Sequence, residues 1–80
     1  MYYVYLLRSI NFPEKTYVGY SSDLKQRLGT HNMGNSIYTA QYRPCQLMAY
    51  FAFVNNLTAK EFETYLKSHA GRAFIHKRFI

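Results

Sequence analysis

The stretch MYYVYLLRSINFPEKTYVGY, residues 1–20, decides the fold. Its first seven residues are almost all aromatic, β-branched or leucine, which is typical of a strand buried on both faces. A polar segment around Pro13, residues 11–15, marks a loop of hairpin length. Residues 16–20, TYVGY, form a second short strand, and a loop this short joins antiparallel neighbours. The sequence therefore predicts that these two strands lie side by side.

A helix is predicted over residues 23–32, directly after the second strand. In the preceding segment SSD, residues 21–23, either serine can accept a bond from a first-turn N–H, and the aspartate suits the positive end of the helix dipole. Leu24 and Leu28 stand four residues apart and give this helix an apolar stripe. The stripe predicts that the helix packs against the sheet.

The second half of the chain predicts one more strand and two more helices. Residues 45–54, CQLMAYFAFV, are the longest apolar run and are the expected central strand. Residues 58–69 follow as a helix that stops at Ala70-Gly71, and residues 72–80 form a weaker third helix. Residues 36–44, before the strand, fit either an ordered loop or a short helical turn.

Length and composition limit the chain to one small domain. Eighty residues that are 49% hydrophobic and 19% aromatic can build a single core, so we expect one domain over residues 1–80. The order strand, strand, helix, strand, helix, helix predicts an α/β fold, with two to three helices packed on a small three-stranded antiparallel or mixed sheet. The single cysteine, Cys45, excludes an intramolecular disulfide and a multi-cysteine zinc site. Without a signal-peptide pattern or a membrane-length apolar stretch, the chain is expected to be soluble and cytoplasmic.

The charge balance is strongly basic. Ten Lys and Arg against four Asp and Glu give a formal net charge of +6. A mild excess usually serves solubility, but this one is large for the length and is spread along the chain. We therefore expect a polyanionic partner, with nucleic acid ahead of a membrane surface.

Tyrosines on the two paired strands are the first candidate functional residues. Side chains alternate along a strand, so Tyr5 and Tyr17 can meet as cross-strand neighbours on one face. Ordinary packing is the commoner explanation for a lone tyrosine, but Gly19 favours function, because a strand glycine often marks the close approach of a ligand or another backbone. Arg27 and His31 share one face of the following helix, and each taken alone is typical of a surface residue.

The two glutamates of the later helix have different expected roles. The segment from Thr58 to Glu61 fits a capping box, which gives Glu61 a structural role. Glu63 lies two residues further on and so faces another direction. It fits equally well as a surface partner of Lys67 and as a metal ligand.

Taken in order, these residues resemble the GIY-YIG nuclease superfamily, and within it the Slx1-type endonuclease domains. Residues 3–7, YVYLL, match the first motif of the superfamily, and residues 17–19, YVG, match the second. Residues 23–32 resemble the helix that follows, and residues 59–67 resemble the later helix with its metal-binding glutamate. The chain departs from the pattern at Tyr3, where the first motif is named for a glycine.

The resemblance implies a metal-dependent endonuclease that hydrolyses DNA phosphodiester bonds, in repair or recombination. Glu63 would bind Mg²⁺ (or Mn²⁺) through its carboxylate. Tyr5 would act as general base, a role that requires a cation or metal to lower its pKa, and Tyr17 would position water or phosphate. Arg27 would offset charge in the transition state, and His31 would contact phosphate or assist proton transfer.

An alternative is a catalytically weak or inactive nucleic-acid-binding module of the same fold, and a third candidate is a basic scaffold for RNA. For the nuclease, the expected partners are DNA and a further protein for targeting. We expect the five candidate side chains to line one shallow, positively charged groove, with the arginine pointing at the tyrosine hydroxyls.

Overall fold

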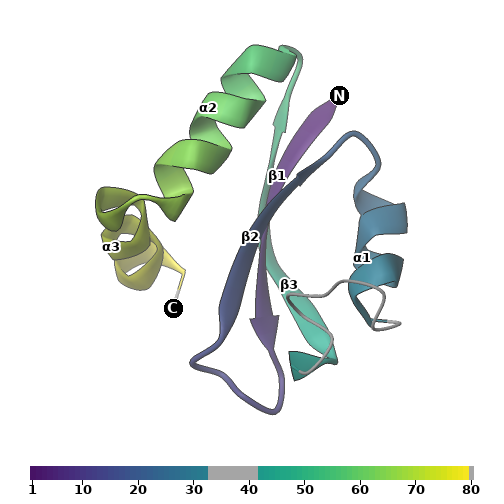
Figure 1. The fold of residues 1–80 in the computed structure, drawn as a ribbon, viewed down its shortest axis with the longest axis vertical. Helices are drawn as coiled ribbons and strands as arrows, with labels where there is room; N and C mark the ends of the chain where they lie inside the picture. Colours follow the sequence, from purple (N-terminus) through teal and green to yellow (C-terminus); the bar gives the residue numbers. More distant parts are fainter. Residues whose placement is uncertain (33–41, 80) are drawn as a thin grey trace.

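The computed structural model describes residues 1–32 and 42–79, with residues 30–32 described by their backbone only (Figure 1). In chain order the elements are β1 (Tyr2–Ser9), β2 (Thr16–Ser21), α1 (Leu24–Asn32), β3 (Cys45–Phe53), α2 (Asn56–Lys67) and α3 (His69–Arg78). The predicted order and the α/β class are confirmed. Most of the ambiguous segment 36–44 lies outside the described residues. No helix in the described ranges has the length and apolar character needed to cross a membrane.

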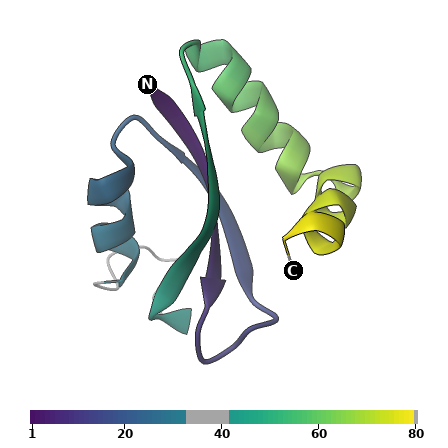
Figure 2. The same cartoon turned by 180° about the vertical axis from the view of Figure 1, so that it is seen from behind.

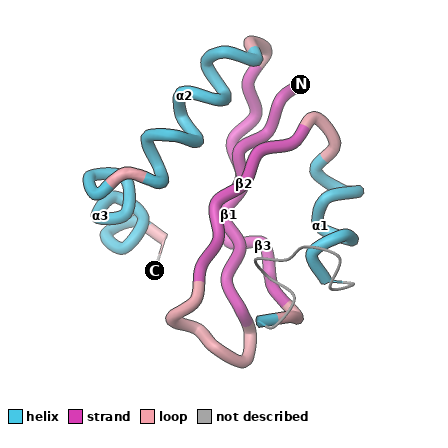
Figure 3. Tube along the Cα trace, in the orientation of Figure 1, coloured by secondary structure: helices cyan, strands magenta, loops and turns pink. Residues whose placement is uncertain are grey.

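The three strands form an antiparallel sheet in the order β2-β1-β3 (Figure 3). β1 is therefore the central strand, and the expectation that residues 45–54 would be central is wrong. Residues 4–7 of β1 are all buried, whereas most of β3 is half-buried or exposed, with Tyr50 54% exposed. An apolar run marks a strand, but only its pairing partners decide whether that strand has one neighbour or two.

Helices cover both faces of the sheet, α1 on one face and α2 with α3 on the other (Figures 1 and 2). Side-chain alternation along β1 divides the core accordingly. Val4 and Leu6 pack toward α2 and α3 with a core of Val18, Ala59, Leu66 and Ile75. On the face of α1, the buried residues Tyr5, Leu7 and Cys45 are surrounded by Tyr17, Leu24, Leu28 and Leu47. The predicted apolar stripe of the first helix thus packs as expected.

The N-terminus of α1 is capped by Asp23. Its carboxylate oxygen Oδ1 accepts a hydrogen bond from the Gln26 N–H at 3.1 Å. The Ser21 hydroxyl instead accepts from the Asp23 N–H at 2.9 Å, so it orders the chain before the helix. A serine thus accepts from the first residue of the predicted helix, as expected, but α1 begins one residue later, at Leu24, with Asp23 as its cap.

The N-terminus of α2 differs from the predicted capping box. Asn55 is the N-cap, and its side-chain oxygen accepts from the Thr58 N–H at 3.1 Å. The helix therefore begins two residues earlier than predicted, and Glu61 lies in its exposed interior. Asn55 and Thr58 are both good cap formers, and the chain uses the one that lies nearer the end of β3.

The junction between α2 and α3 lies at Ser68, and the predicted stop at residues 70–71 is wrong. The Ser68 hydroxyl oxygen accepts from the Gly71 N–H at 3.2 Å and caps α3. Gly71 is buried inside α3, and a Cβ built there would stand 2.5 Å from the Leu66 Cα. This glycine therefore allows the two helices to approach closely and does not end a helix.

Candidate active site

Tyr5 lies across the edge strand β2 at Gly19. The strand register pairs Tyr5 with Gly19 and Leu7 with Tyr17, so the two tyrosines are diagonal neighbours on one face. Their ring centroids are 6.5 Å apart. A Cβ built on Gly19 would lie 2.7 Å from Tyr5 Cε2 and would collide with the hydroxyl end of the ring. The close approach expected at Gly19 is thus made by a tyrosine side chain.

The Tyr5 hydroxyl lies in an electrostatic field set by three other candidate residues. Tyr5 is only 2% exposed, and burial is the main cause that raises the pKa of its hydroxyl above the ordinary value. The proximity of Tyr17 and the negative charge of Glu63 raise this pKa further, while the positive charge of Arg27 lowers it. Tyr17, Arg27 and Glu63 therefore all lie within electrostatic reach of the Tyr5 hydroxyl.

The protein groups alone raise the pKa of Tyr5, so its expected role as general base depends on a cation or metal that lowers this pKa. A general base at neutral pH needs a lowered pKa, but burial keeps the Tyr5 proton in place and Arg27 only partly opposes it. Tyr5 is therefore a neutral phenol, able to donate or accept a hydrogen bond. Further positive charge beside the Tyr5 hydroxyl would lower its pKa, as Arg27 does.

Arg27 reaches the cluster from α1, on the face that carries both tyrosine rings. The helix is positioned by the Asp23 cap and by Leu24 and Leu28, which pack against the sheet. The Arg27 side chain is exposed. Its guanidinium therefore meets solvent while its charge still acts on Tyr5, which suits contact with an anionic ligand that arrives from outside.

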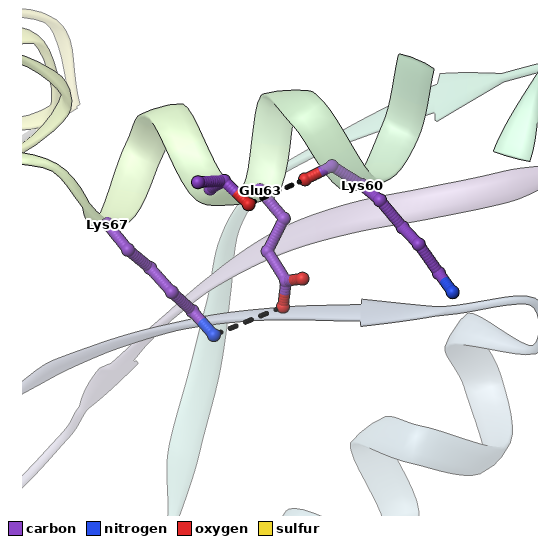
Figure 4. Close-up of polar contacts among 4 residues, drawn as sticks. Lys60, Glu63 and Lys67 are labelled. Atoms are coloured by element: carbon purple, nitrogen blue, oxygen red, sulfur yellow. Dashed lines mark hydrogen bonds and ion pairs between the residues drawn. The ribbon is translucent and has the colours of Figure 1, made fainter. Parts of the chain in front are cut away.

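Glu63 reaches the cluster from α2, on the opposite face of the sheet. Its carboxylate projects from the helix on the same side as Lys60 and Lys67 (Figure 4). Lys67 Nζ lies 3.2 Å from Glu63 Oε2, and the two side chains are 52% and 22% exposed. The Glu63–Lys67 ion pair, one of the two roles that the sequence left open for Glu63, is present. The negative charge of Glu63 also raises the pKa of Tyr5. Both expected roles are therefore compatible with one position.

The donor set fits a hydrated, oxygen-seeking cation. Among residues 1–29 and 42–79, no group of three or more His, Cys, Asp or Glu side chains is close enough to hold a metal ion. A site with Glu63 as its one carboxylate suits Mg²⁺, which keeps several waters and is bound through one or two carboxylates plus substrate phosphates. A zinc site would need more protein ligands than the described side chains of this cluster offer.

His31 lies on α1, one helical turn after Arg27, but its side chain is outside the described residues. Its role stays a prediction. Sequence reasoning missed a basic wall beside the cluster, formed by Lys15, Arg72 and His76. The available signal was the spacing of Arg72 and His76, which places both on one face of a helix.

The fold and this cluster define a nuclease class. The model of the GIY-YIG catalytic domain family matches residues 1–77, and the chain belongs to that family. The resemblance expected from the two tyrosine motifs is thereby confirmed.

The chain is similar to UPF0213 proteins and to an endonuclease subunit. It is 35% identical over 72 residues to the UPF0213 protein SpyM3_1077 of Streptococcus pyogenes serotype M3, a match that covers 89% of this chain and 76% of the relative. It is 35% identical over 77 residues to the structure-specific endonuclease subunit SLX1 of Malassezia globosa, across 90% of this chain but 17% of that protein. The solution NMR structure of the UPF0213 protein BH0048 from Bacillus halodurans matches with a TM-score of 0.58 and 27% identity, covering 99% of this chain and 87% of the other.

Proposed function

We propose that this protein is a metal-dependent endonuclease that hydrolyses DNA phosphodiester bonds at the cluster around Tyr5. One observation carries the proposal: the Tyr5 and Tyr17 rings meet across β1 and β2, and the charges of Arg27 and Glu63, from helices on opposite faces of the sheet, lie within electrostatic reach of the Tyr5 hydroxyl. Core packing alone has no need of an arginine and a glutamate around one buried hydroxyl. The net charge of +6 supports a polyanionic substrate.

Glu63 is the residue that would hold the divalent cation, Mg²⁺ or Mn²⁺. When bound, the ion supplies polarisation of the scissile phosphate and stabilisation of the leaving oxygen. Lys67 is paired with Glu63 and has to move away for the carboxylate to bind an ion. Because the Lys67 side chain is about half exposed, its ammonium group can turn toward a substrate phosphate.

The other residues bind and orient the reacting groups. Tyr5 accepts a hydrogen bond from the attacking water and holds its oxygen toward the phosphorus. With its pKa lowered by Arg27 and a bound cation, Tyr5 would take the proton of that water as general base. Tyr17 is half-buried and positions water or a phosphate oxygen through its hydroxyl. The exposed Arg27 guanidinium offers two donors to phosphate oxygens and stabilises the charge that develops in the transition state.

Cleavage assays on duplex, flap and single-stranded DNA, with and without Mg²⁺ or Mn²⁺, test the proposal. Glu63→Gln should abolish cleavage, because it removes the charge that binds the ion and changes little volume. Glu61→Gln, on the same helix and exposed, is the matched control and should cleave like the wild type. Normal cleavage by both variants would show that Glu63 is wrongly assigned, and absence of cleavage of every substrate with either metal would sink the enzyme proposal.

The second candidate is a nucleic-acid-binding module without useful turnover. The Glu63–Lys67 ion pair and the raised pKa of Tyr5 favour it, since both describe a stable resting arrangement. This candidate predicts DNA binding that Glu63→Gln leaves unchanged and no cleavage with either metal. A targeting protein, a role in repair and a cytoplasmic location stay predictions.

A further inference from the structure

A hollow of about 730 Å³ lies beside the candidate active site, between the β1–β2 hairpin with β2 on one side and the corner of α2 and α3 on the other. Its apolar floor is formed by core residues of these elements. Its polar wall is lined by Glu14, Lys15, Tyr17, Lys67, Arg72 and His76. Lys15, Lys67 and Arg72 are cationic, and even with the carboxylates of Glu14 and of Glu63, the ion-pair partner of Lys67, the region carries a net positive charge. We call this feature the basic hollow.

The basic hollow and the candidate active site share two residues. Tyr17 lines the hollow, and its ring packs against Tyr5 with centroids 6.5 Å apart. Lys67 lines the hollow, and its ammonium lies 3.2 Å from the Glu63 carboxylate. A polymer with one phosphate at the active site therefore has its neighbouring units at the mouth of the hollow.

Arg72 occupies a position that helix stability does not favour. It lies in the first turn of α3, where the positive end of the helix dipole repels a cation, and that turn has no acidic residue. Its side chain is exposed and lines the hollow one helical turn before His76. On the opposite wall, Lys15 lies at the end of the hairpin loop, with its Nζ 5.5 Å from the centroid of the Tyr42 ring, so it has to turn to reach a phosphate in the hollow. The charge of Arg72 therefore does not stabilise the helix, and its side chain lines the hollow.

We propose that the basic hollow binds the backbone phosphates of DNA that flank the scissile phosphate. The inference rests on the proposed function and adds the path of the strand, which runs from Tyr17 toward Arg72 and Lys15. A volume of about 730 Å³ is in the usual range for ligand sites. Cationic walls above an apolar floor suit a nucleic-acid strand, because phosphates contact the walls while sugars lie over the floor.

Binding of a fluorescent duplex, measured by anisotropy in EDTA over a series of salt concentrations, tests the basic hollow without any cleavage. Arg72→Gln should weaken binding by about eightfold at 0.1 M salt and reduce the slope of log K against log salt by about 0.9, the effect of one lost phosphate contact. Lys15→Gln should act in the same direction. Arg78→Gln is the matched control, since Arg78 is exposed on the last turn of α3 and does not line the hollow.

Equal slopes for the wild type, Arg72→Gln and Arg78→Gln would overturn the inference, as would the absence of DNA binding by the wild type. Thermal melting of each variant confirms that the fold is kept. This assay stands apart from catalysis: a protein that binds with the expected slopes but never cleaves refutes the proposed enzyme and supports the basic hollow. Cleavage together with unchanged slopes refutes the basic hollow alone.

Neutral methylphosphonate linkages locate the contact along the strand. The neutral linkages are placed one at a time around the cleaved bond. A neutral linkage at the phosphate that Arg72 contacts should weaken DNA binding by the wild type but should not weaken binding by Arg72→Gln any further. The proposed path of the strand is supported if this difference between the wild type and Arg72→Gln is seen for a neutral linkage directly next to the cleaved bond, on either side. The proposed path is overturned if the difference is seen only for linkages at distant phosphates, or for no linkage.

Discussion

The ring of Tyr5 lies across Gly19 of the neighbouring strand and fills the space where a side chain would stand. This contact joins the first tyrosine motif of the chain to the second. The glycine is needed because the tyrosine hydroxyl has to reach the edge of the sheet, where Glu63 and Arg27 act on it from opposite faces. A packing constraint thus sets the geometry of the candidate active site.

Gly19→Ala should destabilise the fold and displace Tyr5. The new methyl group would overlap the Tyr5 ring, and overpacking of this kind costs about 1–3 kcal/mol of unfolding free energy. Urea unfolding measures the loss. Gly29→Ala is the control, because that position in α1 has no heavy atom near the added Cβ. It should gain up to about 1 kcal/mol from better helix propensity, and equal effects of the two substitutions would contradict the contact.

Folding stability should fall in alkaline solution because of Tyr5. Its pKa is raised in the folded chain by burial and then by Tyr17 and Glu63, whereas in the unfolded chain it is about 10. The contribution of Tyr5 to folding stability is therefore fully present below a pH of about 10, and it is lost as the pH rises toward the pKa of Tyr5 in the folded chain. Unfolding free energies between pH 9 and 12, roughly the range that brackets the unfolded value, measure this loss. Tyr5→Phe has no proton to release there and should show a flatter profile; identical profiles would be the contrary result.

Arg27→Ala should slow cleavage without loss of fold. The guanidinium lies near Tyr5 and faces solvent, so its removal takes away stabilisation of charge in the transition state. A loss of one such donor typically lowers kcat by about 10²–10³-fold. Single-turnover kinetics with saturating protein measure the chemical step. Lys25→Ala, also exposed on α1, controls for the loss of a positive charge and should change this rate little.

Asn55→Ala should destabilise α2 by about 1 kcal/mol, because it removes the side-chain acceptor for the Thr58 N–H. Thr58→Ala should be close to neutral, since Thr58 lies inside the helix and alanine is the better helix former. Thermal or urea unfolding compares the two variants. A larger loss of stability in Thr58→Ala than in Asn55→Ala would contradict the Asn55 cap and support the capping box predicted from the sequence.

Local patterns predicted the secondary structure well and its connections less well. The β1–β2 hairpin followed from two aromatic runs joined by a short polar loop, and the Leu24–Leu28 stripe indicated which side of α1 packs. The position of β3 at the sheet edge could not be predicted, because apolar content does not specify strand neighbours. Gly71 looked like a helix stop, since sequence does not distinguish a glycine that ends a helix from one that lets two helices approach.

The sequence by itself determined the order of elements, the face on which Tyr5 and Tyr17 lie and membership of the GIY-YIG family, because each depends on local periodicity or on ordered motifs. Only the tertiary structure decided that helices on opposite faces bring Arg27 and Glu63 to one hydroxyl. It also decided the direction of the Tyr5 pKa, which depends on burial by distant segments of the chain. Both are long-range effects, since closing the chain around the sheet edge places residues that are far apart in sequence within electrostatic reach of each other.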